Sequence, residues 1–160
     1  MRAYAGPTPF TPSAPHHPSG GRFSEDYPVK EKILCWFAEW ATLKPRIHFS
    51  KEPIVYFKER QIWWASIGQN IGSEENGKHG NFERPVIIFK KFNPQTFLAV
   101  PISTTGKEGA HRLVFGGKET RFVANLSQMR VLSSKRLLRL VGNMLLADYM
   151  QLSEMYKKMV

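Results

Sequence analysis

Two neighbouring stretches, RPVIIFKKF (84–92) and TFLAVPI (96–102), decide the fold class of this 160-residue chain. Both are short runs rich in β-branched, aliphatic and aromatic residues, a composition that favours strands over helices. Asn93-Pro94 lies between them and is a turn signal. The pattern therefore predicts two consecutive strands joined by a tight connection.

Further short strands are expected on both sides of this pair. They are 61–66, 113–115, 121–124, 129–132 and 140–144. Gly116-Gly117 marks a hairpin, and residues 133–138 are expected to form a short helical turn. A long loop rich in glycine, asparagine and charge covers 67–83. Many short strands with closely spaced turns predict a mainly β fold, either a small barrel or a sandwich.

A helix is expected at each end of this β region. The first covers about 29–43, where apolar residues recur at helical spacing, with Pro28 at its start and Pro45 as a forced stop. Its apolar stripe must pack on the body of the protein or on a second chain. The second helix is expected over 147–159. Its predicted inner face holds Leu146, Tyr149, Met150, Ser153 and Tyr156.

The chain divides into three parts by composition. Residues 1–28 hold six of the eleven prolines and few aliphatic residues, so they are expected to be a disordered tail. Residues 29–52 form the N-terminal helix and a linker, and 53–160 form the folded domain. Cys35 is the only cysteine; it excludes an intramolecular disulfide and is expected to be a small buried side chain.

Neither a secretory signal nor a membrane segment is expected. No stretch reaches the roughly 18 to 20 consecutive apolar residues that a membrane span needs, and the first residues lack the apolar centre of a signal peptide. A cytoplasmic protein without membrane contact is therefore expected.

The charge is strongly basic and unevenly placed. The formal net charge is +10. Residues 84–139 contain eleven lysines or arginines and only two acidic residues, Glu108 and Glu119. Such a region is either a solvated basic surface or the electrostatic footprint of a polyanion. Composition alone leaves both open.

Several segments resemble the MazF/PemK family of toxins in the same order and at similar spacing. They are IWWASIGQNIGSEENG (62–77), RPVIIF (84–89), AVPIST (99–104), LSQMRVL (126–132) and the Ser-Lys-Arg of 134–136. The resemblance covers about residues 55–160. It implies an SH3-like small β-barrel with helices attached, to which the residues before it add an amphipathic N-terminal helix.

The resemblance also implies a function. Members of the family are toxins of type II toxin–antitoxin systems that cleave single-stranded RNA without a metal or other cofactor. They act as homodimers with an RNA groove across the interface, and an antitoxin inhibits them. Cleavage by the ribose 2′-hydroxyl would give a 2′,3′-cyclic phosphate and a 5′-hydroxyl. The basic surface and an acidic, extended antitoxin segment would be complementary.

Three residues are the catalytic candidates. Arg84 matches the family's catalytic arginine, and its guanidinium offers a fork of N–H donors to phosphate oxygens. Because guanidinium stays protonated at neutral pH, electrostatic stabilisation is the role expected for it. Ser103 falls where the family usually has threonine, and its oxygen lacks the rotamer restriction of that residue. Glu74 is a weaker candidate, either orienting Arg84 or keeping the loop solvated.

Other residues are expected to contact RNA. They are Thr104, Lys107, Arg112, Gln128, Arg130, Trp64 and Phe82. Trp63 and Trp64 are adjacent in one strand and so face opposite sides of the sheet, with one in the core and the other available to stack on a base or to be buried under the last helix. No motif or carboxylate cluster predicts a metal site. His79 and His111 have suitable chemistry but lie at no catalytic position of the family.

Two other functions stay open from the sequence. Ser103 in place of threonine is compatible with a non-catalytic protein on the same fold, which binds RNA without cleavage or binds gyrase like the related CcdB toxins. A barrel that binds double-stranded DNA is disfavoured because no helix-turn-helix signal is present. The N-terminal helix could also be regulatory, by lying over the groove or over the antitoxin surface.

Overall fold

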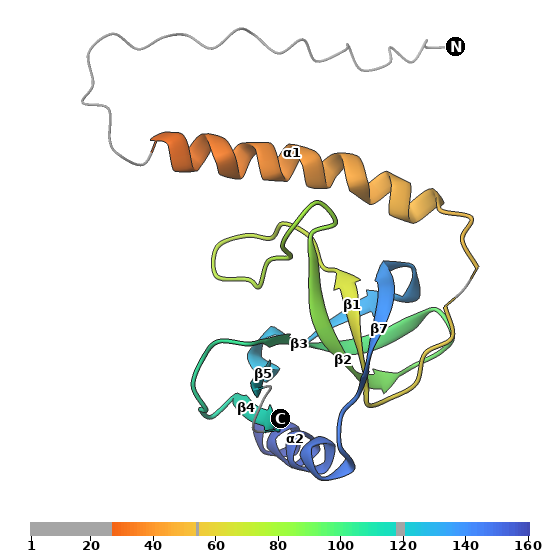
Figure 1. Ribbon diagram of the computed structural model, residues 1–160, viewed down its shortest axis with the longest axis vertical. Coiled ribbons are helices and arrows are strands. Elements are labelled where there is room, and N and C mark those ends of the chain that lie inside the picture. The colour runs from red at the N-terminus through yellow and green to blue at the C-terminus, as the bar shows by residue number, and fades with distance from the viewer. Residues whose placement is uncertain (1–26, 54, 118–120) are drawn as a thin grey trace, which may run out of the picture.

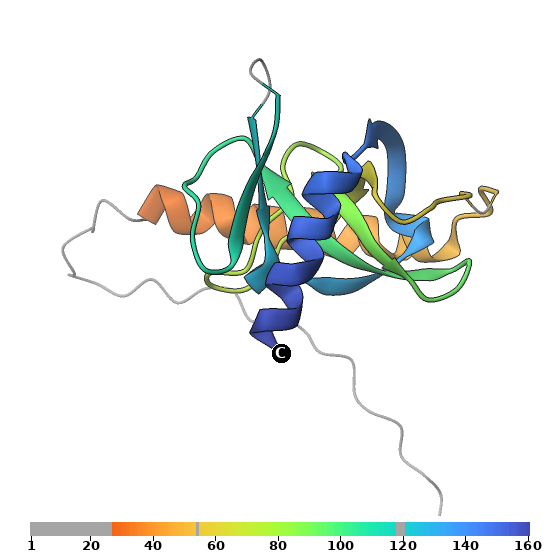
Figure 2. The same cartoon turned by 90° about the horizontal axis from the view of Figure 1, so that it is seen from below.

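Seven antiparallel strands form one sheet, with a helix on either side of it (Figures 1 and 2). The structure is a computed structural model that describes residues 27–53, 55–117 and 121–160. The strands are β1 (Gln61–Ser66), β2 (Glu83–Lys91), β3 (Thr96–Ser103), β4 (Arg112–Gly116), β5 (Arg121–Asn125), β6 (Arg130–Ser133) and β7 (Leu137–Asn143). The helices are α1 (Tyr27–Phe49) and α2 (Leu146–Met159), with short 3-10 turns η1 (Leu126–Gln128) and η2 (Ser134–Arg136).

The sheet runs in the order β4-β5-β3-β2-β1-β7, and β6 also pairs with β3. On one edge β3 pairs with β2, and on the other its start pairs with β6 and its end with β5. Within the described strands no pairing joins β4 to β7, so backbone hydrogen bonds leave the barrel-like sheet open. The expected fold class, mainly β with a helix at each end, is confirmed.

The apolar run of β2 is buried on both faces. Ile87 and Phe89 belong to a core cluster that includes Leu152 of α2, whereas Val86 and Ile88 belong to a second cluster around Phe57. Successive side chains of a strand point to opposite faces, so a strand covered on both sides must be apolar throughout. This double burial explains why RPVIIF lacks the alternation of a half-exposed strand.

Helix α2 contacts the sheet through a face that matches the expected one in part, because Tyr149 and Tyr156 pack against the core. Leu152 is fully buried, and the Tyr149 hydroxyl donates a hydrogen bond of 2.6 Å to the carbonyl of Phe89. The expected inner residues Leu146 and Met150 are instead 56% and 60% exposed. The helix is rotated so that the two tyrosines, with ring centroids 5.8 and 5.3 Å from that of Phe89, flank Leu152.

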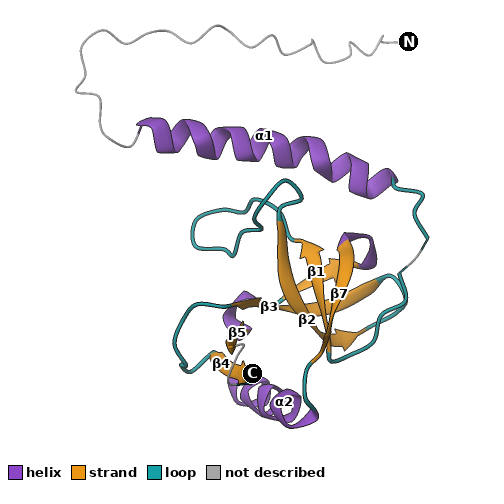
Figure 3. Ribbon diagram, viewed as in Figure 1, coloured by secondary structure: helices purple, strands orange, loops and turns teal. Residues whose placement is uncertain are grey.

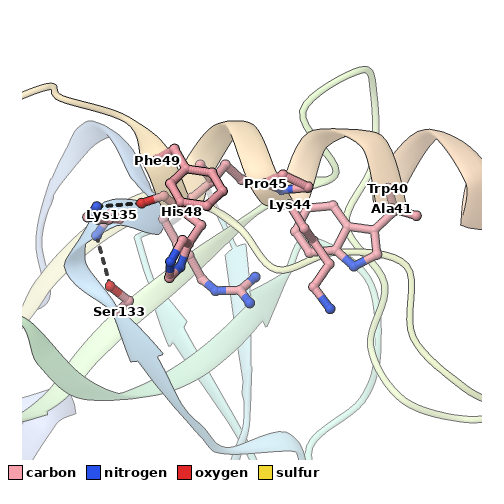
Figure 4. Close-up of a pocket in the computed structure, with 10 residues that line it drawn as sticks. Trp40, Ala41, Lys44, Pro45, His48, Phe49, Ser133 and Lys135 are labelled. Atoms are coloured by element: carbon pink, nitrogen blue, oxygen red, sulfur yellow. Dashed lines mark hydrogen bonds between the residues drawn. The ribbon is translucent and has the colours of Figure 1, made fainter. Parts of the chain in front are cut away.

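Helix α1 continues through Pro45 to Phe49, so the predicted stop at Pro45 was wrong. Proline removes one backbone donor and disfavours a helix interior, but tertiary contacts outweigh this cost here. The ammonium of Lys135 in η2 donates to the carbonyl of His48 at 2.6 Å (Figure 4), which holds the last turn in place. It also lies 3.4 Å from the carbonyl of Ser50, to which it donates a longer hydrogen bond. None of the helices described is long and apolar enough to span a membrane.

Helix α1 touches the body of the protein mainly through Trp40. This residue is 7% exposed; its ring lies 5.7 Å from that of Phe82, and the Arg136 guanidinium lies 5.4 Å from it. Much of the helix remains exposed, including Cys35, whose expected burial was wrong because the residue lies away from this anchor. Residues 1–28 were expected to be disordered. Of these, residues 1–26 lie outside the part of the chain that the structure describes.

Gly68 makes the close approach of Trp40 possible. It has φ +96°, and a Cβ built on it would lie 2.4 Å from the Trp40 ring. Gly72 has a similarly positive φ of +58°, but a Cβ there would meet no atom within 4 Å. Gly68 is therefore constrained by backbone conformation and by packing, whereas Gly72 is constrained by conformation alone.

We predict that Gly68→Ala displaces Trp40 and loosens α1, whereas Gly72→Ala carries only the conformational cost of about 1 kcal/mol. Thermal unfolding and hydrogen exchange of α1 would measure both effects. Faster exchange in α1 is expected for Gly68→Ala only. Equal protection of α1 in the two variants would show that Trp40 does not anchor the helix.

Candidate active site

A cavity of about 290 Å³ lies where β1, β2 and β3 meet the loop between β1 and β2. The lining residues that carry a polar side-chain group are Trp64, Lys78, His79, Glu83, Arg84, Ser103 and Thr104. Apolar side chains, among them Ile102, Phe122 and Val141, complete its walls. Arg84, Ser103, Thr104 and Trp64 of the sequence-based set thus meet in one place.

Strand register accounts for the meeting of Arg84 and Ser103. In the β2–β3 ladder Val86 lies opposite Pro101. Continued by two residues, the same register brings Arg84 opposite Ser103, and side chains two apart on a strand share a face. The two groups are therefore placed by backbone pairing at the end of the sheet.

The Arg84 guanidinium is held by the loop between β1 and β2. Its Nε donates to the carbonyl of Asn76 at 2.9 Å, and its Nη1 lies 2.8 Å from a carboxylate oxygen of Glu75. The Arg84 side chain is only 14% exposed. These contacts fix the plane of the guanidinium and engage two of its five N–H donors, so the fork retains donors for an anion.

Glu75, and not Glu74, is the carboxylate that contacts Arg84. Glu74 instead accepts a local hydrogen bond of 3.1 Å from the backbone N–H of Ile71 and lies away from the cavity. The sequence could not separate two adjacent glutamates, because which of them points inward depends on the turn at 71–74. The loop lies between α1 and the sheet (Figure 3).

Gln128 and Arg130 hold this loop from the other side. The Gln128 side-chain oxygen accepts from the Glu75 N–H at 3.0 Å, and Arg130 donates to the Glu75 carbonyl at 3.0 Å. Asn125 donates to the Glu75 carboxylate at 3.3 Å. Gln128 and Arg130, which were both expected to contact RNA, thus support Glu75, the residue that positions Arg84. Their contact with RNA stays a prediction.

Ser103 is partly exposed at the end of β3. Its Oγ accepts a hydrogen bond of 3.1 Å from the N–H of Thr105 and lies 3.1 Å from the Thr105 hydroxyl. These contacts restrict the position of the serine oxygen, as the methyl group would in threonine. Thr104 is exposed at the same rim.

Trp64 and Glu83 are joined through Arg139 of β7. The Arg139 guanidinium lies 4.6 Å from the Trp64 ring and donates to both oxygens of Glu83, at 3.0 and 2.7 Å. Glu83 is only 6% exposed, and its hydrogen bond with Arg139 lowers the pKa of this carboxyl. Glu83 is therefore a paired carboxylate rather than a free base. Trp63, on the opposite face, is in the core as expected.

His79 and Lys78 line the cavity although no family position pointed to them. The loop tip closes through a bridge in which Lys78 and Glu83 exchange backbone hydrogen bonds of 2.8 and 2.9 Å. His79 within this tip has φ +60°, an uncommon conformation for a residue with a side chain. A histidine five residues before Arg84 was the only signal in the sequence.

Three further residues expected to contact RNA lie outside the cavity. Phe82 is only 4% exposed and packs against Trp40, so it is a core residue and not a free stacking surface. Lys107 and Arg112 are exposed but do not line the cavity. Within the described ranges, histidine, cysteine and acidic residues form no cluster of three that could hold a metal ion.

A larger cavity of about 590 Å³ lies under the end of α1, between that helix and η2 (Figure 4). Trp40, Lys44, Lys135 and Arg136 are among its lining residues, and none of these lines the Arg84 cavity. Lys135 is bonded to the end of α1, and Arg136 donates to the carbonyl of Ser66 at 2.8 Å. This cavity marks the attachment of α1.

Residues 58–159 match the sequence model of a family described as PemK-like, MazF-like toxins of type II toxin–antitoxin systems. The chain belongs to this family. The match begins after α1, so the first helix is an addition to the toxin domain. No curated protein matches the sequence.

One solved structure shares the fold of the toxin domain. An endoribonuclease in complex with its cognate antitoxin from a mycobacterial species is 13% identical, with 64% of this chain and 93% of that chain covered and a TM-score of 0.52. The Mycobacterium tuberculosis toxin MazF-mt6 is 19% identical, with 62% and 94% covered and a TM-score of 0.48.

Proposed function

We propose that this toxin is a metal-independent endoribonuclease that cleaves single-stranded RNA through attack of the ribose 2′-hydroxyl on the adjacent phosphate. The observation that carries the proposal is that Arg84, held by Glu75 and Asn76, lines one cavity with Ser103. Membership of the toxin family supports it. One protein of the same fold is described as an endoribonuclease bound to its antitoxin.

The reaction needs stabilisation of negative charge on phosphorus. In the transition state the nonbridging phosphate oxygens gain charge, and a guanidinium with free donors stabilises them best when it is fixed beforehand. Arg84 meets both conditions, because the loop fixes it and engages only two of its five N–H donors. Its role is electrostatic, since guanidinium does not act as a base at neutral pH.

Proton transfer must also be supplied within the cavity. The 2′-hydroxyl loses a proton and the 5′-oxygen gains one, giving a 2′,3′-cyclic phosphate and a 5′-hydroxyl. Ser103 orients the phosphate or relays a proton, with Thr104 beside it. Imidazole is the side chain best suited to exchange protons near neutral pH, which makes His79 the candidate for one of the two transfers. Glu74 takes no part in either proton transfer, because it does not line the cavity.

A homodimer through β7 and the start of α2 would place the RNA groove beside this cavity. The exposed apolar side chains there are Leu138, Leu140, Val141, Leu145, Leu146 and Met150. Exposed apolar side chains on neighbouring elements are typical of an interaction site. Val141 is 48% exposed and also lines the cavity, so a partner seated on β7 would form part of its rim.

The cognate antitoxin would carry an acidic, extended segment. Lys107 and Arg112 are exposed, and the net charge of +10 favours an acidic partner as well as RNA. RNA and the antitoxin would compete for the same basic surface. We place the protein in the cytoplasm.

An RNA-binding protein without cleavage is the second candidate. The observation that favours it is the engagement of Ser103 Oγ by Thr105, which leaves the hydroxyl less free than an unbonded threonine would be. Unchanged RNA after incubation with a protein that binds it would select this candidate.

We predict that the purified protein cleaves single-stranded RNA in the presence of EDTA. Arg84→Ala should reduce the rate by about 10²- to 10³-fold, as the loss of one preorganised charge donor does, while the fold persists. Arg46→Ala, at an exposed position of α1 outside the cavity, is the matched control and should change the rate by less than about threefold. Cleavage by Arg84→Ala at the normal rate would remove this residue from the mechanism.

We predict that the protein is a dimer and that Leu140→Asp makes it monomeric, because a charge in an apolar interface must lose its water. Light scattering would measure the mass, and circular dichroism would report the fold. Leu34→Asp, at an exposed position of α1, is the control and should remain dimeric. A folded, dimeric Leu140→Asp variant would place the interface elsewhere.

A further inference from the structure

A second cavity lined by Arg84, of about 500 Å³, lies between α1 and the loop that holds this arginine. Lys78, His79 and Arg84 line it and also line the active-site cavity. Its other walls include Trp36 and Glu39 of α1 and the amides Gln69 and Asn76 of the loop. Arg84 and the loop tip therefore form a boundary with one cavity on each side.

We propose that this second cavity is a nucleobase subsite, in which Trp36 stacks on the base of a nucleotide next to the scissile linkage. The inference rests on the proposed function, because it takes single-stranded RNA as the substrate at Arg84. A phosphate bound at Arg84 leaves its neighbouring nucleotide within reach of the adjoining cavity. The shared wall makes the two sites continuous.

Trp36 has the properties of a stacking platform. Its side chain is 38% exposed, and the Lys32 ammonium lies 5.2 Å from its ring centroid. Single-stranded RNA is bound by aromatic rings that stack on bases, together with cations that accompany the backbone. Trp36 with Lys32 and Lys78 supplies this combination, whereas a buried tryptophan such as Trp40 cannot.

The polar groups of the cavity match the edges of a base. Asn76 is fixed, because its Oδ1 accepts from the N–H of Asn70 at 2.6 Å and its carbonyl accepts from Arg84. Its amide N–H groups and the Gln69 amide can donate to a base edge, and the Glu39 carboxylate can accept from an exocyclic amine. A carboxylate repels phosphate, so Glu39 favours a base over the RNA backbone at this wall.

The α1 wall is held firmly enough to recognise a base. Trp40, one turn after Trp36, is buried against Gly68 and Phe82. Lys135 fixes the far end of the same helix through the carbonyl of His48. Because α1 precedes the family match at residues 58–159, the subsite would add to the RNA preference of the toxin domain.

The test compares Trp36→Ala and Trp36→Phe with the wild type on a random single-stranded RNA pool in EDTA. Trp36→Ala should raise KM by about tenfold, since stacking on one base contributes roughly 1–3 kcal/mol, and leave kcat within about twofold. Mapped cut ends should lose nucleotide preference at one position beside the cut. Trp36→Phe, which keeps a stacking ring, should restore most of the affinity. Leu34→Ala, also exposed on α1, is the control and should match the wild type.

Unchanged KM and unchanged cut sites in a folded Trp36→Ala variant would overturn the subsite. If the wild type cleaves no RNA, the proposed function fails, and the subsite is then judged by binding alone. A labelled random single-stranded DNA pool, which lacks the attacking hydroxyl, serves as the probe. Weaker binding by Trp36→Ala but not by Leu34→Ala would support the subsite, and equal binding by all three proteins would reject it.

Discussion

The contact between Arg84 and the loop residues Glu75 and Asn76 is the constraint on which the site depends. The loop must leave β1, pass beneath α1 and return so that its carbonyl and carboxylate reach the guanidinium at 2.9 and 2.8 Å. Gly77 allows this path, because a Cβ there would lie 1.8 Å from the carbonyl oxygen of Phe82. The two arms of the loop are thus closer than any other residue type would permit.

Glu75 connects the charge of the site to the rest of the molecule. Its backbone N–H donates to the Gln128 side chain, its carbonyl accepts from Arg130, and its carboxylate accepts from Asn125. Each of these contacts reduces the freedom of the carboxylate before any substrate arrives. Preorganisation of this kind lowers the reorganisation needed when charge develops on a phosphate. The same loop carries His79 and Lys78 to the cavity wall.

The strands could be predicted because each has a strong local signal, as in the doubly buried run of β2. The nearness of Arg84 and Ser103 is consistent with the register of β2 and β3, two consecutive strands that the sequence predicted on either side of Asn93-Pro94. Features that depend on tertiary contacts could not be predicted from the sequence. The continuation of α1 past Pro45 depends on Lys135, and the rotation of α2 depends on Phe89.

The site residues divide in the same way. The strand residues Trp64, Arg84 and Ser103 line one cavity, whereas the loop residue Glu74 does not. Glu74 and Glu75 differ by one position, and only the conformation of the loop decides which contacts Arg84. Phe82 was predicted to contact RNA, but α1 covers it through Trp40. The helix that covers it lies outside the family, so no family pattern could have indicated the contact.

The most direct measurement of the central claim is RNA cleavage by Glu75→Gln beside Glu74→Gln, two adjacent isosteric changes that each remove one negative charge. If the Glu75 carboxylate positions Arg84, the first variant should lose about tenfold or more in kcat, and the second should stay near the wild-type rate. Equal rates for the two variants would contradict the account, because the guanidinium would then be placed without its carboxylate.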